Sequence, residues 1–113
     1  MAQGSVEIFS HSVITTAAAI NGRAVTATGA LPAVSTRCLG FAKFDQPTIG
    51  LRVNVAVLGS TIAEAGAAIA VGALLELDAL GRVITKATGV TVGSALSAAV
   101  NVGDKIEIVL IPN

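Results

Sequence analysis

The sequence predicts a mainly β protein: a single small β-barrel or β-sandwich of short strands, with at most one or two short helical turns. Its 113 residues are the size of one domain. Several segments alternate apolar and polar residues with a period of two, which is typical of strands with one buried face. The 12 glycines recur between the apolar runs, as they do where short strands are joined by tight turns.

The first elements are short. Residues 1–19 form either an N-terminal arm or a first strand, and residues 6–9 (VEIF) are the part with strand character. Residues 20–113 form the β domain, in which residues 23–26 (RAVT) are the first candidate strand.

The clearest strand is residues 51–57 (LRVNVAV), where the valines fall on one face and Arg52, Asn54 and Ala56 on the other. Residues 105–111 (KIEIVLI) alternate at first and then become continuously apolar before Pro112. We expect that strand to begin with one wet face and to end buried on both faces or against a partner chain.

A hairpin is predicted over residues 74–85, because residues 74–78 and 82–85 are apolar runs joined by a short turn. Asp78 and Gly81 supply the side chain and the backbone freedom that such turns use. The Ala-rich residues 62–71 and 94–100 are interrupted or bounded by glycine. We assign both to loops or short helical turns.

A weak internal repeat relates the two halves of the chain. A shift of 53 residues places 39–42 on 92–95 and 49–57 on 102–110, and a shift of 60 places 27–29 on 87–89. One hypothesis is that two similar sub-units, residues 26–59 and 85–112, close one barrel or sandwich. The alternative is that any two glycine-punctuated β units look alike.

Composition narrows the class of protein. The net charge is zero and only 12% of residues are charged, which argues against a disordered tail and against nucleic acid as a ligand. The chain is 53% apolar, mostly through 21 Ala and 14 Val. Small side chains bury little area each, so we expect homo-oligomerisation to add buried surface.

Membrane and export signals are both weak. The longest uncharged stretch, residues 87–103, contains Thr, Ser, Asn and Gly, so it does not resemble a membrane-spanning helix. The first ten residues contain Glu7 and no Lys or Arg, which is the wrong charge for a signal peptide.

Reactive side chains are few, and the sequence predicts neither an enzyme nor a bound cofactor or metal ion. His11 is the only histidine, and Cys38, the only cysteine, is expected to be a buried thiol. Glu76 and Asp78 better fit a solvated strand face than a hard-ion site. The basic residues of the first half favour a protein interface or no role, since Trp and Tyr are absent. They are Arg23, Arg37, Lys43 and Arg52.

Six segments together carry a resemblance to a known family, in their order and spacing. They are residues 38–42 (CLGFA), 53–59 (VNVAVLG), 64–72 (EAGAAIAVG), 77–83 (LDALGRV), 92–96 (VGSAL) and 102–106 (VGDKI). With the apolar strand before Pro112, the pattern resembles the capsid cement, or decoration, proteins of tailed bacteriophages. The likeness covers roughly residues 20–113.

The resemblance implies a non-enzymatic structural protein of the virion, made in the bacterial host cytoplasm. Such proteins bind the outside of the assembled head at junctions between major capsid protein subunits and stabilise it. They are small homo-oligomers, so a homotrimer is expected in preference to a dimer, with no nucleic acid or membrane partner. The alternatives are another phage structural component, such as a tail or head-fibre subunit, and a small β binding module.

Contact residues are expected at two places. In the N-terminal arm, residues 2–12, we expect capsid contact through Val6, Ile8, Phe9 and His11, and strand addition is one mode for this contact. The alternative is that residues 6–9 form an ordinary strand of the domain's own sheet. Contact between subunits is expected at Phe41, Phe44, Val109 and Ile111.

Overall fold

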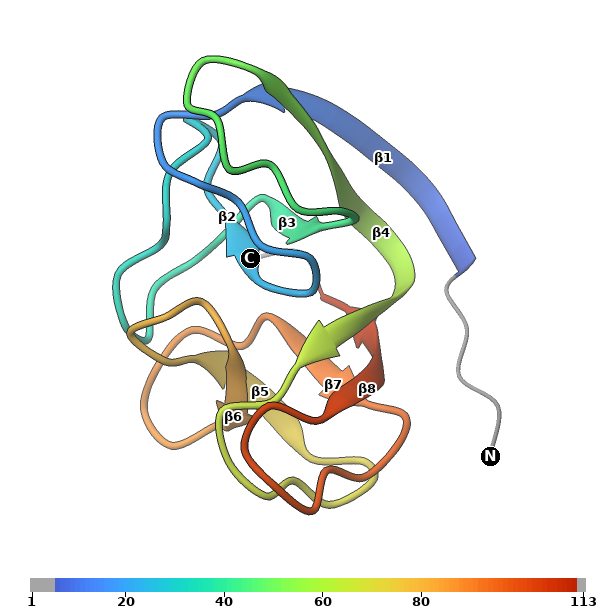
Figure 1. The fold of residues 1–113 in the computed structure, drawn as a ribbon. Helices are drawn as coiled ribbons and strands as arrows, with labels where there is room; N and C mark the ends of the chain where they lie inside the picture. Colours follow the sequence, from blue (N-terminus) through green and yellow to red (C-terminus); the bar gives the residue numbers. More distant parts are fainter. Residues whose placement is uncertain (1–5, 112–113) are drawn as a thin grey trace.

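The computed structural model describes the fold of residues 6–111 and the side chains of residues 9–111. Eight strands and no helix lie in this part of the chain (Figure 1). The strands are β1 (Val6–Ile14), β2 (Ala24–Val25), β3 (Gly40–Ala42), β4 (Arg52–Glu64), β5 (Leu74–Leu77), β6 (Val83–Thr85), β7 (Gly93–Ala95) and β8 (Lys105–Leu110).

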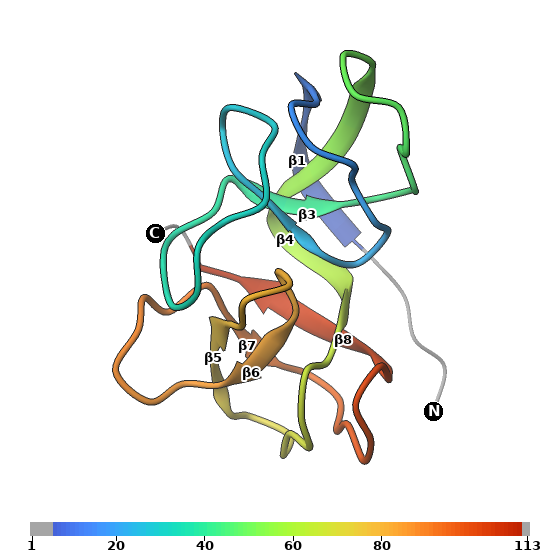
Figure 2. The same ribbon diagram turned by 60° about the vertical axis from the view of Figure 1, so that its left-hand side comes forward.

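The strands form one curled antiparallel sheet in the order β2-β3-β4-β8-β7-β5-β6, and β1 pairs with β4 outside this path. The mainly β prediction is therefore confirmed. The 13-residue β4 links two groups of strands, because its first part pairs with β1 and β3 and its last part with β8. Figure 2 shows β5, β6, β7 and β8 below β1 and β3, with β4 running from one group to the other.

The long strand β4 extends well beyond the predicted residues 51–57. It continues to Glu64 because residues 60–64 pair with β8, from Ser60 opposite Val109 to Glu64 opposite Lys105. Tertiary pairing here overrides the low strand propensity of alanine. The assignment of residues 62–64 and 94–95 to loops or helical turns is wrong, since both lie in strands.

The predicted hairpin is confirmed, since β5 and β6 pair antiparallel from Leu75–Thr85 to Leu77–Val83. In its turn, Asp78 Oδ1 accepts hydrogen bonds from the main-chain N–H groups of Leu80 and Arg82, each at 2.9 Å. Asp78 Oδ2 pairs with Arg82 Nε at 2.9 Å, and Gly81 takes the left-handed φ of 77° that the turn needs.

The core consists of two clusters of buried apolar side chains. The larger contains mostly residues between Ala63 and Leu110, together with Ala24, Cys38, Phe41 and Ala56. The smaller contains Val13, Ala19, Val25, Ala42, Val53 and Val55. Phe41 heads the fully buried side chains by volume, at 0% exposure. Its ring supplies the area that the surrounding Ala and Val side chains lack.

The pairing of the strands in the first half of the chain repeats in the second half, with a shift of 50 residues for β1 and β2 and of 53 residues for β3 and β4. The pairs Phe41–Ala56 and Ser94–Val109 differ by 53 residues in both members. Ala24 pairs with Phe41 as Leu74 pairs with Ser94. Val13 pairs with Val53 as Ala63 pairs with Ile106. Matching pairs of this kind make residue 24 equivalent to residue 74, and residue 41 equivalent to residue 94.

The loops follow the same pattern. Gly22 N–H donates to Ala42 O, and the equivalent Gly72 N–H donates to Ala95 O. In the same way, Gly50 N–H donates to Thr15 O and Gly103 N–H donates to Ala65 O. We infer two similar units that share β4: a first unit, residues 6–58, and a second unit, residues 60–110.

One part of the sequence repeat is wrong. The turn of residues 26–30 has the hydrogen bonds of residues 78–82, because Gly29 N–H donates to Thr26 O as Gly81 N–H donates to Asp78 O. Residues 27–29 are therefore equivalent to residues 79–81, and the shift of 60 onto residues 87–89 matches composition alone.

Phe41→Ala should lower the free energy of unfolding by about 3–5 kcal/mol, because it leaves a ring-sized cavity in the larger cluster. Phe44→Ala, at a ring that is 42% exposed, is the matched control and should lose a much smaller amount. Equilibrium denaturant unfolding at one fixed protein concentration measures both. If the two variants lose the same free energy of unfolding, Phe41 is not the main buried side chain of the core.

Candidate interaction surfaces

Within the part of the chain that the structure describes, no group of three or more His, Cys, Asp or Glu could hold a metal ion. His11 is exposed on β1, with its ring centroid 6.3 Å from that of Phe9. Cys38 is buried, as predicted. In the same residues, no helix is long and apolar enough to cross a membrane.

The prediction that Glu76 lies on a solvated strand face is wrong, because the residue is buried and has a structural role. Only 4% of the residue is exposed, and its carboxylate accepts hydrogen bonds from the Ser35 hydroxyl and from the N–H groups of Ala87 and Gly89. These bonds, led by that of Ser35, hold the pKa of Glu76 below its usual value of 4.5. Glu76 therefore fastens the loop at Ser35, in the first unit, to the loop at residues 87–89 in the second.

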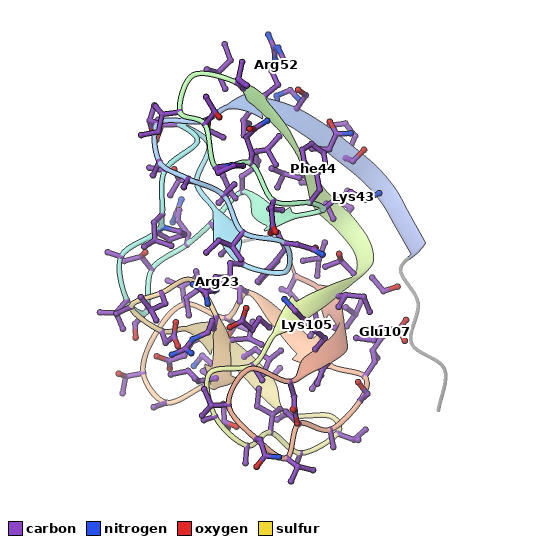
Figure 3. The ribbon with its side chains drawn as sticks, in the orientation of Figure 1. Arg23, Lys43, Phe44, Arg52, Lys105 and Glu107 are labelled. Carbon is purple, nitrogen blue, oxygen red and sulfur yellow. The ribbon has the colours of Figure 1, made fainter. Side chains whose placement is uncertain are left out.

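A second buried carboxylate, Glu64, also joins the two units. Its oxygens accept from Arg23 Nε at 3.1 Å and Nη2 at 3.0 Å, and Lys105 Nζ lies 3.4 Å from Oε1. Lys105 Nζ also donates to Asn21 O at 2.8 Å. The Arg23 hydrogen bond is the main cause that lowers the pKa of Glu64, while burial opposes it. In Figure 3, Arg23 and Lys105 both lie near the end of β4.

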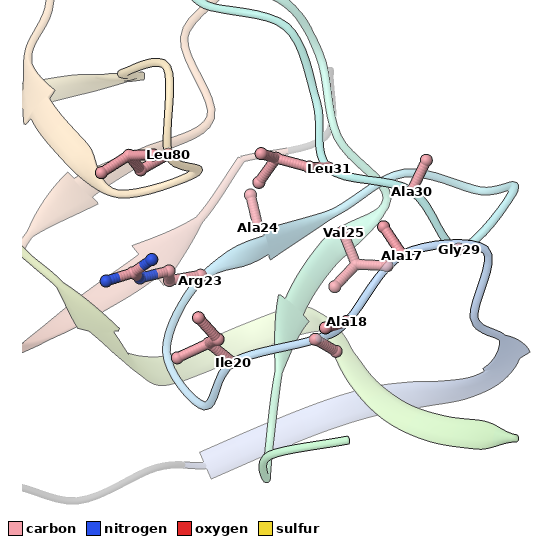
Figure 4. Close-up of a pocket in the computed structure, with 11 residues that line it drawn as sticks. Ala17, Ala18, Ile20, Arg23, Ala24, Val25, Gly29, Ala30, Leu31 and Leu80 are labelled. Atoms are coloured by element: carbon pink, nitrogen blue, oxygen red, sulfur yellow. The ribbon is translucent and has the colours of Figure 1, made fainter. Parts of the chain in front are cut away.

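The hollows of the surface are shallow and mostly lined by small side chains. The one in Figure 4 has a volume of about 80 Å³ and lies among alanines, with Ile20, Leu31 and Leu80. Its one charged lining residue, Arg23, already pairs with Glu64. Sites for small organic ligands usually have about 300–1,000 Å³, so this hollow is too small for one. A wider hollow of about 380 Å³ is lined by Thr26, Ala27, Thr28, Arg37, Cys38 and Leu39.

Large apolar side chains are exposed mainly at strand ends and turns. The most exposed are Val100 at 76%, Val71 at 66%, Ile49 at 64% and Val102 at 61%. Others are Phe9, Ile14, Leu51, Leu74 and Val109. Exposed apolar area of this kind, with few charges nearby, is typical of surfaces that bind other protein.

The contact residues predicted from the sequence lie in different places. Phe9 and His11 are brought together on the surface of β1, while the side chains of Val6 and Ile8 lie outside the described residues. Phe41 is fully buried inside the chain, because the second unit covers it.

Among the residues expected between subunits, Phe44 is 42% exposed and Val109 37%. Ile111 is half-buried beside a hollow that Cys38 and Val92 also line. Val109 is therefore not buried within one chain, and of the two alternatives predicted for the end of this strand, contact with a partner chain stays a prediction.

Ile14, Val71 and Leu74 are among the exposed side chains that the sequence did not point to. The predicted first strand stopped at Phe9, although β1 continues to Ile14. Val71 and Leu74 lie on either side of Gly72, as Asn21 and Ala24 lie on either side of Gly22. Laying the sequence over itself with a shift of 50 residues would have shown this equivalence.

Because the folded-state pKa of Glu76 lies below 4.5, its contribution to stability is present above about pH 4.5 and is lost as the pH falls through the lower value. Glu76→Gln should therefore melt at a lower temperature than the wild type at pH 7. The two melting temperatures should converge as the solution is acidified below pH 4.5. Thermal unfolding followed by circular dichroism across this range measures both. A difference that does not change with pH would contradict this role of the carboxylate.

The comparisons with known proteins agree with this fold. Among curated proteins, none matches the chain. Among solved structures, the crystal structure of the N base of head fiber gp8.5 in bacteriophage phi29 matches with a TM-score of 0.76. The match is 20% identical and covers 91% of this chain and 93% of that one, and at this identity it shows a shared fold. The family model of the phage cement protein matches residues 8–110, from β1 to β8. The chain therefore belongs to the phage cement protein family, as the sequence resemblance indicated.

Proposed function

We propose that this protein binds the outside of an assembled phage capsid, at junctions between major capsid protein subunits, and stabilises the head. It has no catalytic role there and acts as a homo-oligomer, for which we propose a homotrimer in preference to a dimer. The observation that carries the proposal is the family match, which spans nearly the whole described fold. Family and fold together make the protein a structural component of a phage virion.

The surface of the molecule suits this role. Many of its exposed side chains are small or apolar and its net charge is zero, so one copy gains little from long-range electrostatic attraction. Several copies joined in one oligomer contact the capsid at several points at once. Linked contacts of this kind raise the overall affinity without any single strong contact.

The surface of β1 is the proposed capsid contact. Of the strands that the structure describes, only β4 pairs with β1, so the other edge of β1 is open to an added strand. Phe9 is 50% exposed and lies beside His11, which gives this strand an aromatic anchor. Val6 and Ile8 belong to the same proposed contact.

A second candidate is the base of a head fibre. The phi29 structure that matches this chain is such a base, and the two folds agree over most of both chains. In this alternative the protein also sits on the capsid, but it serves there as the attachment point of a head fibre.

The test is to mix the purified protein with undecorated, expanded phage heads and to image the pelleted particles by cryo-EM. Extra density at regular sites between capsid subunits supports the cement role, and its local symmetry gives the number of copies. Density only beneath a projecting fibre supports the second candidate. A folded oligomer that adds no density to the heads contradicts both.

Phe9→Ser should weaken binding to these heads by about tenfold, because it removes the aromatic anchor from a central contact. Leu80→Ser is the matched control, since Leu80 is 45% exposed in the β5–β6 turn, and it should bind as the wild type does. Co-sedimentation at a series of protein concentrations measures the affinity. Equal binding by the two variants would show that β1 is not the contact.

A further inference from the structure

The two units contact each other through different surfaces. In the first unit, Ala24, Phe41 and Ala56 are neighbours across β2, β3 and β4. This row is 0–3% exposed and belongs to the cluster formed with the second unit. The second unit thus covers this row of the first.

The equivalent row of the second unit is open. Leu74, Ser94 and Val109 are neighbours across β5, β7 and β8 in the same register. Leu74 is 50% exposed and Val109 is 37% exposed. Two units related by a twofold axis would bury equivalent residues equally, so these units are related head-to-tail.

A pair of equivalent turns shows the same difference. Gly22 and Gly72 have φ values of 84° and 86°. Gly22 O accepts the N–H of Glu64 at 2.8 Å, and a Cβ on Gly22 would lie 3.0 Å from Lys105 Nζ. A Cβ on Gly72 would meet nothing within 4 Å. The backbone that the first unit uses to bind the second is thus repeated, uncovered, on the second.

We propose that the open face of the second unit binds the first unit of another copy of this chain, in the manner of the contact within the chain. The open face is Val71, Gly72, Leu74, Ser94 and Val109. A head-to-tail contact leaves one surface of each kind unused, so a further copy can continue it. The proposal rests on the self-association in the proposed function and not on capsid binding.

The equivalence of the two units also predicts which residues the second copy contributes to this contact. Within the chain, Glu64 contacts Arg23 and lies against the turn at Gly22. The residue equivalent to Glu64 is Ile14, which is 52% exposed, and the residue equivalent to Arg23 is Ala73.

Between copies, the acid–arginine pair is therefore replaced by Ile14 against Ala73. Val71, equivalent to Asn21, is 66% exposed beside it. Both sides of this contact change from polar to apolar together, so the complementarity is retained. The N–H of Ile14 takes the place of the Glu64 N–H and would donate to Gly72 O of the other copy.

The rest of the receiving surface is partly open. In the second unit, Val92 and Leu110 are 1% and 8% exposed, in one cluster with Cys38 of the first unit. Their equivalents in the first unit, Leu39 and Val57, are half-buried, and Leu39 lines the hollow of about 380 Å³. Another copy would cover these two side chains as the first unit covers Val92 and Leu110.

Ile14→Glu should convert the oligomer to monomer at concentrations where the wild type is fully assembled, because it places a carboxylate against Ala73, which lacks the guanidinium that Arg23 offers Glu64 within the chain. Size-exclusion chromatography with light scattering measures the molar mass. Ile49→Glu is the matched control and should keep the wild-type mass. Its equivalent, Val102, is 61% exposed in the turn before β8 and is not covered by the contact within the chain, so Ile49 should also stay uncovered.

The double variant Ile14→Glu with Ala73→Arg should recover the oligomer, because it rebuilds the Arg23–Glu64 pair between copies. A monomeric wild type, an unchanged mass for Ile14→Glu, a loss for Ile49→Glu, or a folded double variant that stays monomeric would each overturn the proposal. Circular dichroism melting confirms that each variant is folded. If the masses behave as expected and the wild type does not bind heads, the capsid role fails and this contact stands.

Discussion

The fold depends on the burial of one sheet face of the first unit under the second unit. Phe41 lies at this contact with Ala24 and Ala56, and none of the three is more than 3% exposed. Elsewhere the core is mostly Ala, Val, Ile and Leu in short strands, which bury little area per residue. Each unit alone is a curled sheet of a few short strands, so the two are stable by covering each other.

Polar groups at the edge of the contact fix its geometry. Glu64 joins Arg23 to Lys105, and Glu76 joins the loop at Ser35 to the loop at residues 87–89. Each of these two residues is less than 9% exposed, and its carboxylate accepts from donors of both units, so a displaced unit would leave it without these partners. Apolar burial supplies the attraction between the units, and these two carboxylates select one arrangement.

Local pattern in the sequence is enough to predict the mainly β class, the β5–β6 hairpin and the strand character of residues 51–57 and 105–110, because alternation and turn residues are local signals. It is not enough to place Ala56 and Val109. These residues hold the same position in equivalent strands, yet Ala56 is buried and Val109 is 37% exposed, because only the first unit is covered within the chain. Local pattern also misplaced Phe41, which was expected between subunits. An aromatic side chain fits a core as well as an interface, and the sequence alone does not distinguish the two.

The structure of the assembled oligomer, by crystallography or cryo-EM, would show whether the contact between copies repeats the contact within the chain. We expect the second unit of one copy and the first unit of the next to superpose on the first and second units of a single chain. Leu74 and Val109 would then be buried as Ala24 and Ala56 are. A twofold contact in which Leu74 meets Leu74 of the other copy, or an assembly that leaves this face in solvent, would contradict it.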